Sequence, residues 1–253
     1  MLGNCKLCRC ENVDLRESHY VPAALYPKNR KLEQFDKNGL IEGRFEFTDY
    51  LLCARCEQRF SERGESHVLG HIAAKIANKP NPLAAKLQKL KVQEEDEEDV
   101  TAKSYCADDA HLDMDMFAYF ALSMFWRGTH AWPKQAGGFT KPLTLGLYTE
   151  PIRAFLAGET MQFPAEVAVI IIVCTDKISR EVWLLPAQID DVWFHDLRFP
   201  AFGVMFRVLL GRSIPDILMR NSCHLPARRI HMGDTSEKTQ EAMRFSEPLG
   251  SAD

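Results

Sequence analysis

The stretch that decides the fold is residues 51–60, LLCARCEQRF. It places two cysteines two residues apart behind a pair of leucines, and residues 5–8, CKLC, repeat this spacing. A two-residue spacer lets both thiolates of one pair reach a single ion, and two such pairs complete the tetrahedral sulfur shell of structural zinc sites. The sequence therefore predicts a zinc ion bound by Cys5, Cys8, Cys53 and Cys56.

Four further cysteines stand outside these pairs. Cys10 lies so close to the first pair that it leaves open which sulfurs bind the ion. Cys106, Cys174 and Cys223 are isolated in the sequence, and we expect them to pack in the core. Buried small hydrophobes are the alternative to a zinc site, but this alternative does not account for the repeated spacing. No basic segment followed by an apolar run opens the chain, so we expect a cytoplasmic protein with reduced thiols.

Length and composition are those of a folded globular protein. The chain has 253 residues, of which 46% are hydrophobic and 26% are charged. This length suffices for one large domain or two small ones, and it excludes a small disulfide-stapled scaffold. The most apolar segment, Leu112–Trp126, contains two aspartates and is shorter than the roughly 18 to 20 residues that span a bilayer. We therefore expect no membrane segment.

Charge divides the chain into three parts. Residues 1–92 carry 16 Lys+Arg and 11 Asp+Glu, a net charge of +5, whereas residues 93–116 carry 1 and 10, a net charge of -9. The remaining residues balance at 14 and 14, so the total of -4 hides a basic front and an acidic belt. We expect a zinc-binding module over residues 1–92, an exposed acidic linker over 93–111 and a larger α+β domain over 112–253.

Apolar patterns predict the elements of an α+β fold. An Asn-Gly turn at residues 38–39 predicts a hairpin whose arms reach to Thr48, and apolar residues recur at helical spacing from Cys56 to Ile76. Leu112–Arg127 is apolar almost all round and predicts a core helix, while Pro151–Ala157 predicts a short helix that ends at Gly158. Strands are expected at Val167–Cys174, Glu181–Leu185 and Phe202–Leu210.

Between the two cysteine pairs lies Ser18-His19, with Pro22 three residues later, and Glu57 follows the second pair directly. In this order the residues resemble the HNH endonucleases, the ββα-metal or His-Me finger group, in the variant with four zinc-binding cysteines. The resemblance covers the N-terminal region only. It implies a small zinc-stabilised ββα-metal module in which His19 is the general base, and in which a divalent cation stabilises the scissile phosphate.

The chain departs from the family pattern at the catalytic metal. Ser18 stands where the family has an aspartate, and a neutral hydroxyl is a weaker ligand for Mg²⁺ than a carboxylate. Glu57, together with Glu65 on the same predicted helix, could supply the missing negative charge. Alternatively, Glu57 only caps its helix, and His19 is a packed side chain in a structural module.

These residues support two hypotheses. The first is a metal-dependent HNH-like endonuclease that cleaves nucleic acid, DNA in particular, with structural Zn²⁺ and catalytic Mg²⁺ or Mn²⁺. The second is a non-catalytic zinc scaffold that binds nucleic acid or protein. In both, the C-terminal domain recognises substrate, an effector or a partner subunit, or forms a homo-oligomer, and the resemblance is compatible with phage defence. Phosphate contacts are expected from Arg16, Lys28, Arg30, Lys31, Arg55 and Arg59.

Overall fold

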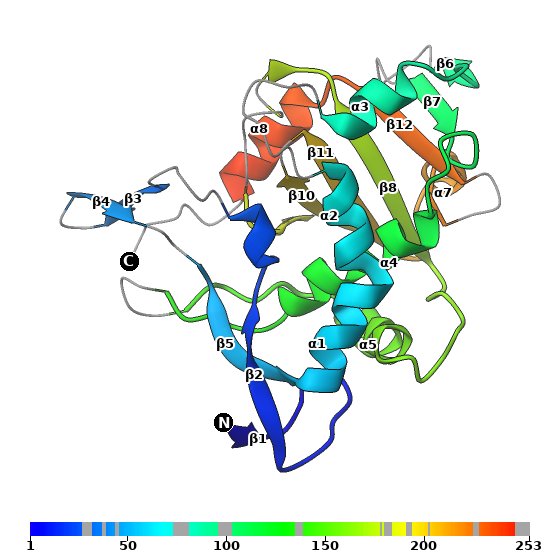
Figure 1. Ribbon diagram of the computed structural model, residues 1–253. Coiled ribbons are helices and arrows are strands. Elements are labelled where there is room, and N and C mark those ends of the chain that lie inside the picture. Colours follow the sequence, from blue (N-terminus) through cyan, green and yellow to red (C-terminus); the bar gives the residue numbers. More distant parts are fainter. Residues whose placement is uncertain are drawn as a thin grey trace.

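The computed structural model is that of an α+β protein (Figure 1). It describes residues 1–26, 32–36, 39–43, 46–72, 81–95, 103–134, 139–177, 179, 184–190, 194–201, 203–224 and 228–245. A small three-stranded sheet and a column of helices form the N-terminal part, and a seven-stranded sheet lies behind them. No helix in this described part is long and apolar enough to cross a lipid bilayer.

The small sheet runs directly into the first helix. Its antiparallel strands are β1 (Leu2–Gly3), β2 (Val13–His19) and β5 (Thr48–Cys53). The register of β2 and β5 runs from Leu15 opposite Cys53 to His19 opposite Thr48. β5 continues into α1 (Ala54–Phe60), so the second cysteine pair spans the junction between strand and helix.

The predicted hairpin consists of β3 (Leu32–Asp36) and β4 (Gly39–Gly43), which project from the rest of the molecule (Figure 1). Asp36 pairs with Gly39, which confirms a hairpin at the Asn-Gly turn, although Asn38 itself lies outside the described residues. β4 ends at Gly43 rather than reaching Thr48, which instead begins β5.

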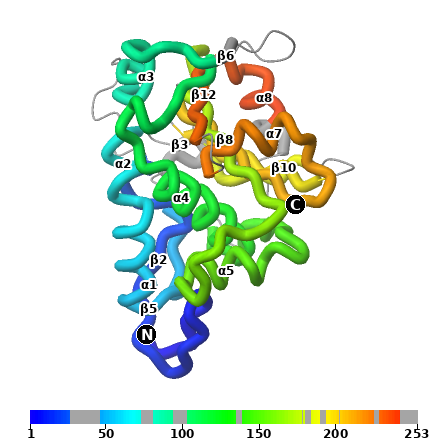
Figure 2. Tube along the Cα trace, turned by 90° about the vertical axis from the view of Figure 1, so that its right-hand side faces the viewer, coloured from blue at the N-terminus to red at the C-terminus, as the bar shows by residue number. Residues whose placement is uncertain are grey.

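Three helical segments stack as one column beside α4 (Met114–Arg127), as Figures 1 and 2 show. α1 continues through a π-helical turn, η2 (Ser61–Glu65), into α2 (Ser66–Ile72). This confirms the predicted helix as far as Ile72, and its expected last residues, 73–76, lie outside the described part. Gly64 in the π-helical turn contacts α4 closely, because a Cβ atom there would lie 3.0 Å from the Phe120 nitrogen. α3 (Pro82–Leu87) begins after Asn81, whose side chain caps it.

The large sheet has the strand order β6, β7, β12, β8, β11, β10, β9. All neighbouring strands are antiparallel except β12 and β8, which run parallel. The strands are β6 (Glu94–Glu95), β7 (Lys103–Cys106), β8 (Val167–Cys174), β9 (Ala187–Asp190), β10 (His195–Ala201), β11 (Val204–Leu210) and β12 (Arg229–Gly233).

α4 covers one face of the large sheet and is buried almost all round, as predicted. Phe120 of α4 packs on Phe206 of β11, with 5.2 Å between the ring centroids. One continuous core therefore joins the large sheet, α4, the helical column and the small sheet. Further short helices in the described part include η1 (Ala23–Leu25), η3 (Gly146–Tyr148), α5 (Thr149–Ala157), α7 (Asp216–Arg220) and α8 (Ser236–Phe245).

Most expected elements of the C-terminal part are confirmed. β8 has its predicted bounds, and β11 covers the strand expected up to Leu210. α5 ends at Ala157 and is capped by the expected Gly158, whose φ of +73° favours glycine. The strand expected at Glu181–Leu185 is wrong for Leu184 and Leu185, which lie in no strand. Both edges of β8 are paired instead with β11 and β12, which are distant in sequence.

Part of the expected acidic linker belongs to the edge of the large sheet. Glu94 pairs with Ser104 and Glu95 with Lys103, and β7 pairs in turn with β12. Residues 96–102 lie outside the described part. Of the isolated cysteines, Cys174 and Cys223 are buried, as predicted, and Cys106 is half-buried at the end of β7.

Candidate functional site

The four predicted cysteines meet where the first loop, β5 and α1 join. Their sulfurs lie within 4.8 Å of one another, and in the described part of the chain they are the only group of three or more His, Cys, Asp and Glu side chains placed to hold a metal ion. The Cys8 and Cys53 sulfurs are 3.8 Å apart, and the Cys53 N–H donates to the Cys5 sulfur at 3.4 Å. Cys10 is exposed and outside the group, so Cys5, Cys8, Cys53 and Cys56 are the sulfurs that can share an ion.

The donor chemistry of this cysteine group suits a metal ion. Four thiolates at this spacing can form a tetrahedral sulfur shell. A hydrogen bond from Cys56 lowers the pKa of Cys5 to about 4, while the same contact raises the pKa of Cys56. The sulfurs of Cys8 and Cys10 raise the pKa of Arg55, which places this cation beside the group. A neighbouring cation favours thiolate over thiol, and the thiolate is the form that binds metal.

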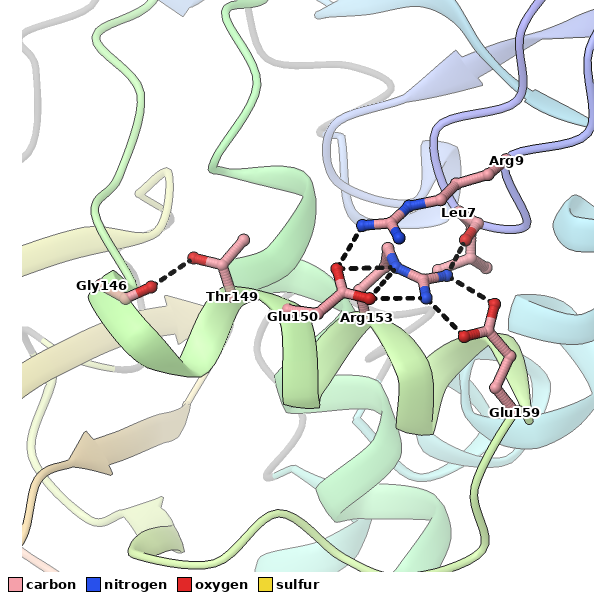
Figure 3. Close-up of polar contacts among 7 residues, drawn as sticks. All are labelled: Leu7, Arg9, Gly146, Thr149, Glu150, Arg153 and Glu159. Atoms are coloured by element: carbon pink, nitrogen blue, oxygen red, sulfur yellow. Dashed lines mark hydrogen bonds and ion pairs between the residues drawn. The ribbon is translucent and has the colours of Figure 1, made fainter.

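A buried arginine ties the first cysteine loop to α5 (Figure 3). Arg153 donates to the carbonyl oxygen of Leu7, which lies inside the first cysteine pair. Its guanidinium also donates to Glu150 and Glu159, with distances of 2.8 Å from Nη2 to Glu150 Oε1 and from Nη1 to Glu159 Oε1. Arg9, from the same loop, pairs with Glu150 on the exposed side. The first loop is thereby held against the C-terminal part of the chain.

His19 is the last residue of β2, and 27% of its side chain is exposed. Its Nε2 lies 3.2 Å from Glu46 Oε2. Since a carboxylate only accepts hydrogen bonds, Nε2 of the neutral ring carries the proton and Nδ1 keeps its lone pair. Glu46 therefore orients the imidazole. Sequence reasoning missed Glu46 because it lies 27 residues from His19 in no recognisable motif.

Ser18, the residue before His19, is fully buried and contacts α1. Its hydroxyl donates to the Glu57 carboxylate and accepts from the Leu52 N–H at 3.2 Å. Glu57 therefore does more than cap its helix, because it joins α1 to the end of β2. Burial raises the pKa of Glu57, and this outweighs the opposite effects of Arg127 and of the Ser18 hydroxyl. The structure thus brings His19, Ser18 and Glu57 to one end of β2.

Glu57 and Glu65 share one buried arginine. Arg127, the last residue of α4, has 2% of its side chain exposed, and its Nη2 lies 2.7 Å from Glu65 Oε1 and 4.0 Å from Glu57 Oε2. The guanidinium carbon lies 4.7 Å from the centroid of the Phe60 ring. Neither Glu65 Oε1 nor Arg127 Nε makes an aligned hydrogen bond within the described residues, so the contact with Glu65 is an ion pair by distance.

The π-helical turn brings the two glutamates toward one side of the helical column. In a regular helix, eight residues at about 100° each leave the side chains of Glu57 and Glu65 about 80° apart. The wider turn over Ser61–Glu65 rotates less per residue and reduces this divergence. Gly64, in the same turn, brings the column against α4, so Glu65 reaches Arg127.

The predicted phosphate-binding residues have different surroundings. Arg16 is exposed on β2, 3.9 Å from Asp14, and Arg55 stands beside the cysteine group. Arg59 packs against the end of α5, where its guanidinium fills the space that a side chain at Gly158 would take. Lys28, Arg30 and Lys31 lie outside the described residues. Arg55 and Arg59 are four residues apart on α1, whereas Arg16 belongs to β2.

Comparison with known proteins gives no relative. No family model matches the chain, and no curated protein or solved structure matches it either. We therefore infer function from two places in the molecule. One is the cysteine group, and the other is the His19 site, by which we mean Ser18, His19, Glu46, Glu57, Glu65 and Arg127.

Proposed function

We propose that the cysteine group binds a structural zinc ion. Its four donors are all sulfur, which favours zinc over hard cations such as Mg²⁺. The group joins the first loop, β5 and α1, which have only a three-stranded sheet of their own. Metal coordination would tie these three segments together in addition to the core that they share with the rest of the molecule.

We propose further that the His19 site hydrolyses phosphodiester bonds in nucleic acid, DNA in particular, as an HNH-like endonuclease. The observation that carries this proposal is the partly exposed imidazole held by Glu46 through Nε2, because Nδ1 is then free to take a proton from water. The net charge of +5 over residues 1–92 favours a polyanionic substrate. The large sheet and its helices would recognise substrate, an effector, a partner subunit or a second copy of the chain.

The resemblance implies a catalytic Mg²⁺ or Mn²⁺, for which Ser18, Glu57 and Glu65 are the candidate ligands in this sequence. In this structure the Ser18 hydroxyl donates to Glu57, and both carboxylates lie against Arg127. Residues placed in this way do not fit a divalent ion, so we derive no step through one.

The test is nicking of a supercoiled plasmid by the zinc-loaded protein, with Mg²⁺, with Mn²⁺ and without added divalent ion. We expect the wild type to nick the plasmid, and His19→Ala to be slower by about 10²- to 10⁴-fold, the usual contribution of a general base. His224→Ala, which removes another partly exposed histidine, is the matched control and should keep full activity. Unchanged zinc content and melting temperature would show that His19→Ala is folded. Full activity of His19→Ala would refute the proposal.

A non-catalytic binding module on the same zinc scaffold is the second candidate. The observation that favours it is Arg127, because this cation neutralises the carboxylates that a nuclease would use for its metal. It predicts DNA binding that weakens steeply with salt, with no nicking under any of the three conditions. Binding without cleavage in the plasmid assay would therefore select this candidate over the nuclease.

A further inference from the structure

The buried guanidinium of Arg127 lies against two of the carboxylates of the His19 site, those of Glu57 and Glu65. Arg127 comes from α4, and it lies between Glu57 and Glu65, which both belong to the helical column. The Phe60 ring faces the guanidinium, and its negative π face adds a further attraction for a cation. Arg127 is therefore held by contacts on several sides, and solvent reaches very little of it.

The charge of the site agrees with a monovalent rather than a divalent cation. Two carboxylates face Arg127, where the family pattern would add a third at the position of Ser18. The Ser18 hydroxyl is turned to Glu57 as a donor. Each change lowers the demand of the site for positive charge.

We propose that Arg127 is the resident cation of the His19 site and lies between Glu57 and Glu65 in place of the divalent ion that the resemblance implies. In this role Arg127 is a positioning residue. It holds Glu57, Glu57 holds the Ser18 hydroxyl, and Ser18 precedes His19 at the end of β2. The C-terminal part of the chain thus completes the site through α4. This inference deepens the proposed nuclease function and rests on it only in treating His19 as the reactive group.

Divalent-ion binding tests this directly, without substrate or turnover. The probe is Mn²⁺, titrated into the zinc-loaded full-length protein and followed by electron paramagnetic resonance of free Mn²⁺. We expect the wild type to show no Glu57-dependent binding up to millimolar Mn²⁺. Arg127→Gln frees both carboxylates and should bind Mn²⁺ at least about tenfold more tightly than the wild type, a change of about 1.4 kcal/mol. Adding Glu57→Gln to that variant should abolish the new binding.

Two control variants separate this role from a general change of charge. Arg127→Lys keeps the positive charge and should bind no more Mn²⁺ than the wild type. Arg59→Gln removes an arginine from the helical column that carries Glu57 and Glu65. The Arg59 guanidinium points instead to Gly158 at the end of α5, so this variant should also leave Mn²⁺ binding unchanged. A gain of Mn²⁺ binding in Arg59→Gln equal to that in Arg127→Gln would overturn the proposal.

The wild type alone decides the question if Arg127→Gln does not fold. Mn²⁺ binding to the wild type that disappears in Glu57→Gln or Glu65→Gln would show that a metal ion displaces Arg127, and would overturn the inference. Absence of such binding supports it. Because the measurement involves no cleavage, the two failures give different results. The nuclease proposal fails if the wild type does not nick the plasmid or if His19→Ala keeps full activity, whereas this inference fails if Mn²⁺ binds the wild type through Glu57 or Glu65.

Discussion

The cysteine group and the His19 site lie in the same N-terminal unit, yet they are completed in different ways. Every sulfur of the cysteine group comes from two pairs that the sequence spaces for one ion. The His19 site takes residues from β2, the segment before β5, α1, the π-helical turn and α4. The first site can therefore assemble with its own unit, whereas the second is charge-balanced only when α4 packs against the helical column.

The largest effect is expected at the cysteine group. Cys56→Ser replaces a buried sulfur donor, and zinc binding contributes about 10–16 kcal/mol to the folding of zinc-finger peptides. We expect this variant to lose its zinc and the fold of the small sheet, as measured by metal content and near-ultraviolet circular dichroism. Cys10→Ser removes a nearby exposed thiol and should keep both. Equal zinc loss in the two variants would contradict the ligand assignment.

The next largest effect is expected at Arg127. Arg127→Gln leaves two facing carboxylates without their buried cation, which should lower the free energy of unfolding by about 3 kcal/mol. Arg59→Gln should cost less than about 1 kcal/mol, because Arg59 interacts mainly with the end of α5. Urea unfolding at neutral pH measures both. Equal losses would mean that Arg127 contributes no more than a half-buried arginine does.

Much of the fold could be predicted from the sequence, because the decisive signals are local. The apolar run of β8, the all-round apolar character of α4 and the glycine after α5 each depend on neighbours along the chain. The strand expected to include Leu184 and Leu185, which the structure does not contain at those two residues, shows the limit of such signals. A strand next in sequence is a natural partner for β8, but the pairing was decided by β11 and β12 across the sheet.

The two sites show the same limit more sharply. Cysteine spacing predicted the whole metal-binding group, and the structure only had to exclude Cys10. For the His19 site the sequence predicted His19, Ser18, Glu57 and Glu65, but neither Glu46 nor Arg127. Arg127 lies 62 positions beyond Glu65, at the end of a helix whose apolar residues indicated only a core. No spacing rule connects residues that meet through tertiary packing.

Arg153 tests whether the cysteine group is as self-contained as its ligands suggest. Arg153→Met removes the buried donor to the Leu7 carbonyl and the bonds to Glu150 and Glu159, and should cost about 2 kcal/mol of unfolding free energy. Arg9→Gln, at an exposed pair with Glu150, should cost less than about 1 kcal/mol. We expect both variants to keep their zinc. Zinc loss in Arg153→Met would show that α5 is needed to complete the cysteine group as well.

The smallest expected effect is a pH dependence that comes from Glu57. Burial raises the pKa of Glu57 above its ordinary value of 4.5, so the folded protein holds this proton more tightly than the unfolded chain. Its contribution to stability is then fully present below the unfolded pKa, and it is lost as pH rises through the folded pKa. Glu57→Gln cannot ionise. The unfolding free energy of the wild type minus that of Glu57→Gln should therefore fall as pH rises from 4.5 toward neutrality.

The sign of this difference identifies the carboxylate that balances Arg127. Glu62→Gln, at an exposed position of the same helical column, is the matched control and should show a smaller change over the same pH range. If the difference for Glu57 rose with pH instead, the ion pair with Arg127 would outweigh burial, and Glu57 would be the main counter-ion. A falling difference assigns that role to Glu65, whose Oε1 is the closer oxygen at 2.7 Å. Glu57 is then left as the link between α1 and the strand that ends in His19.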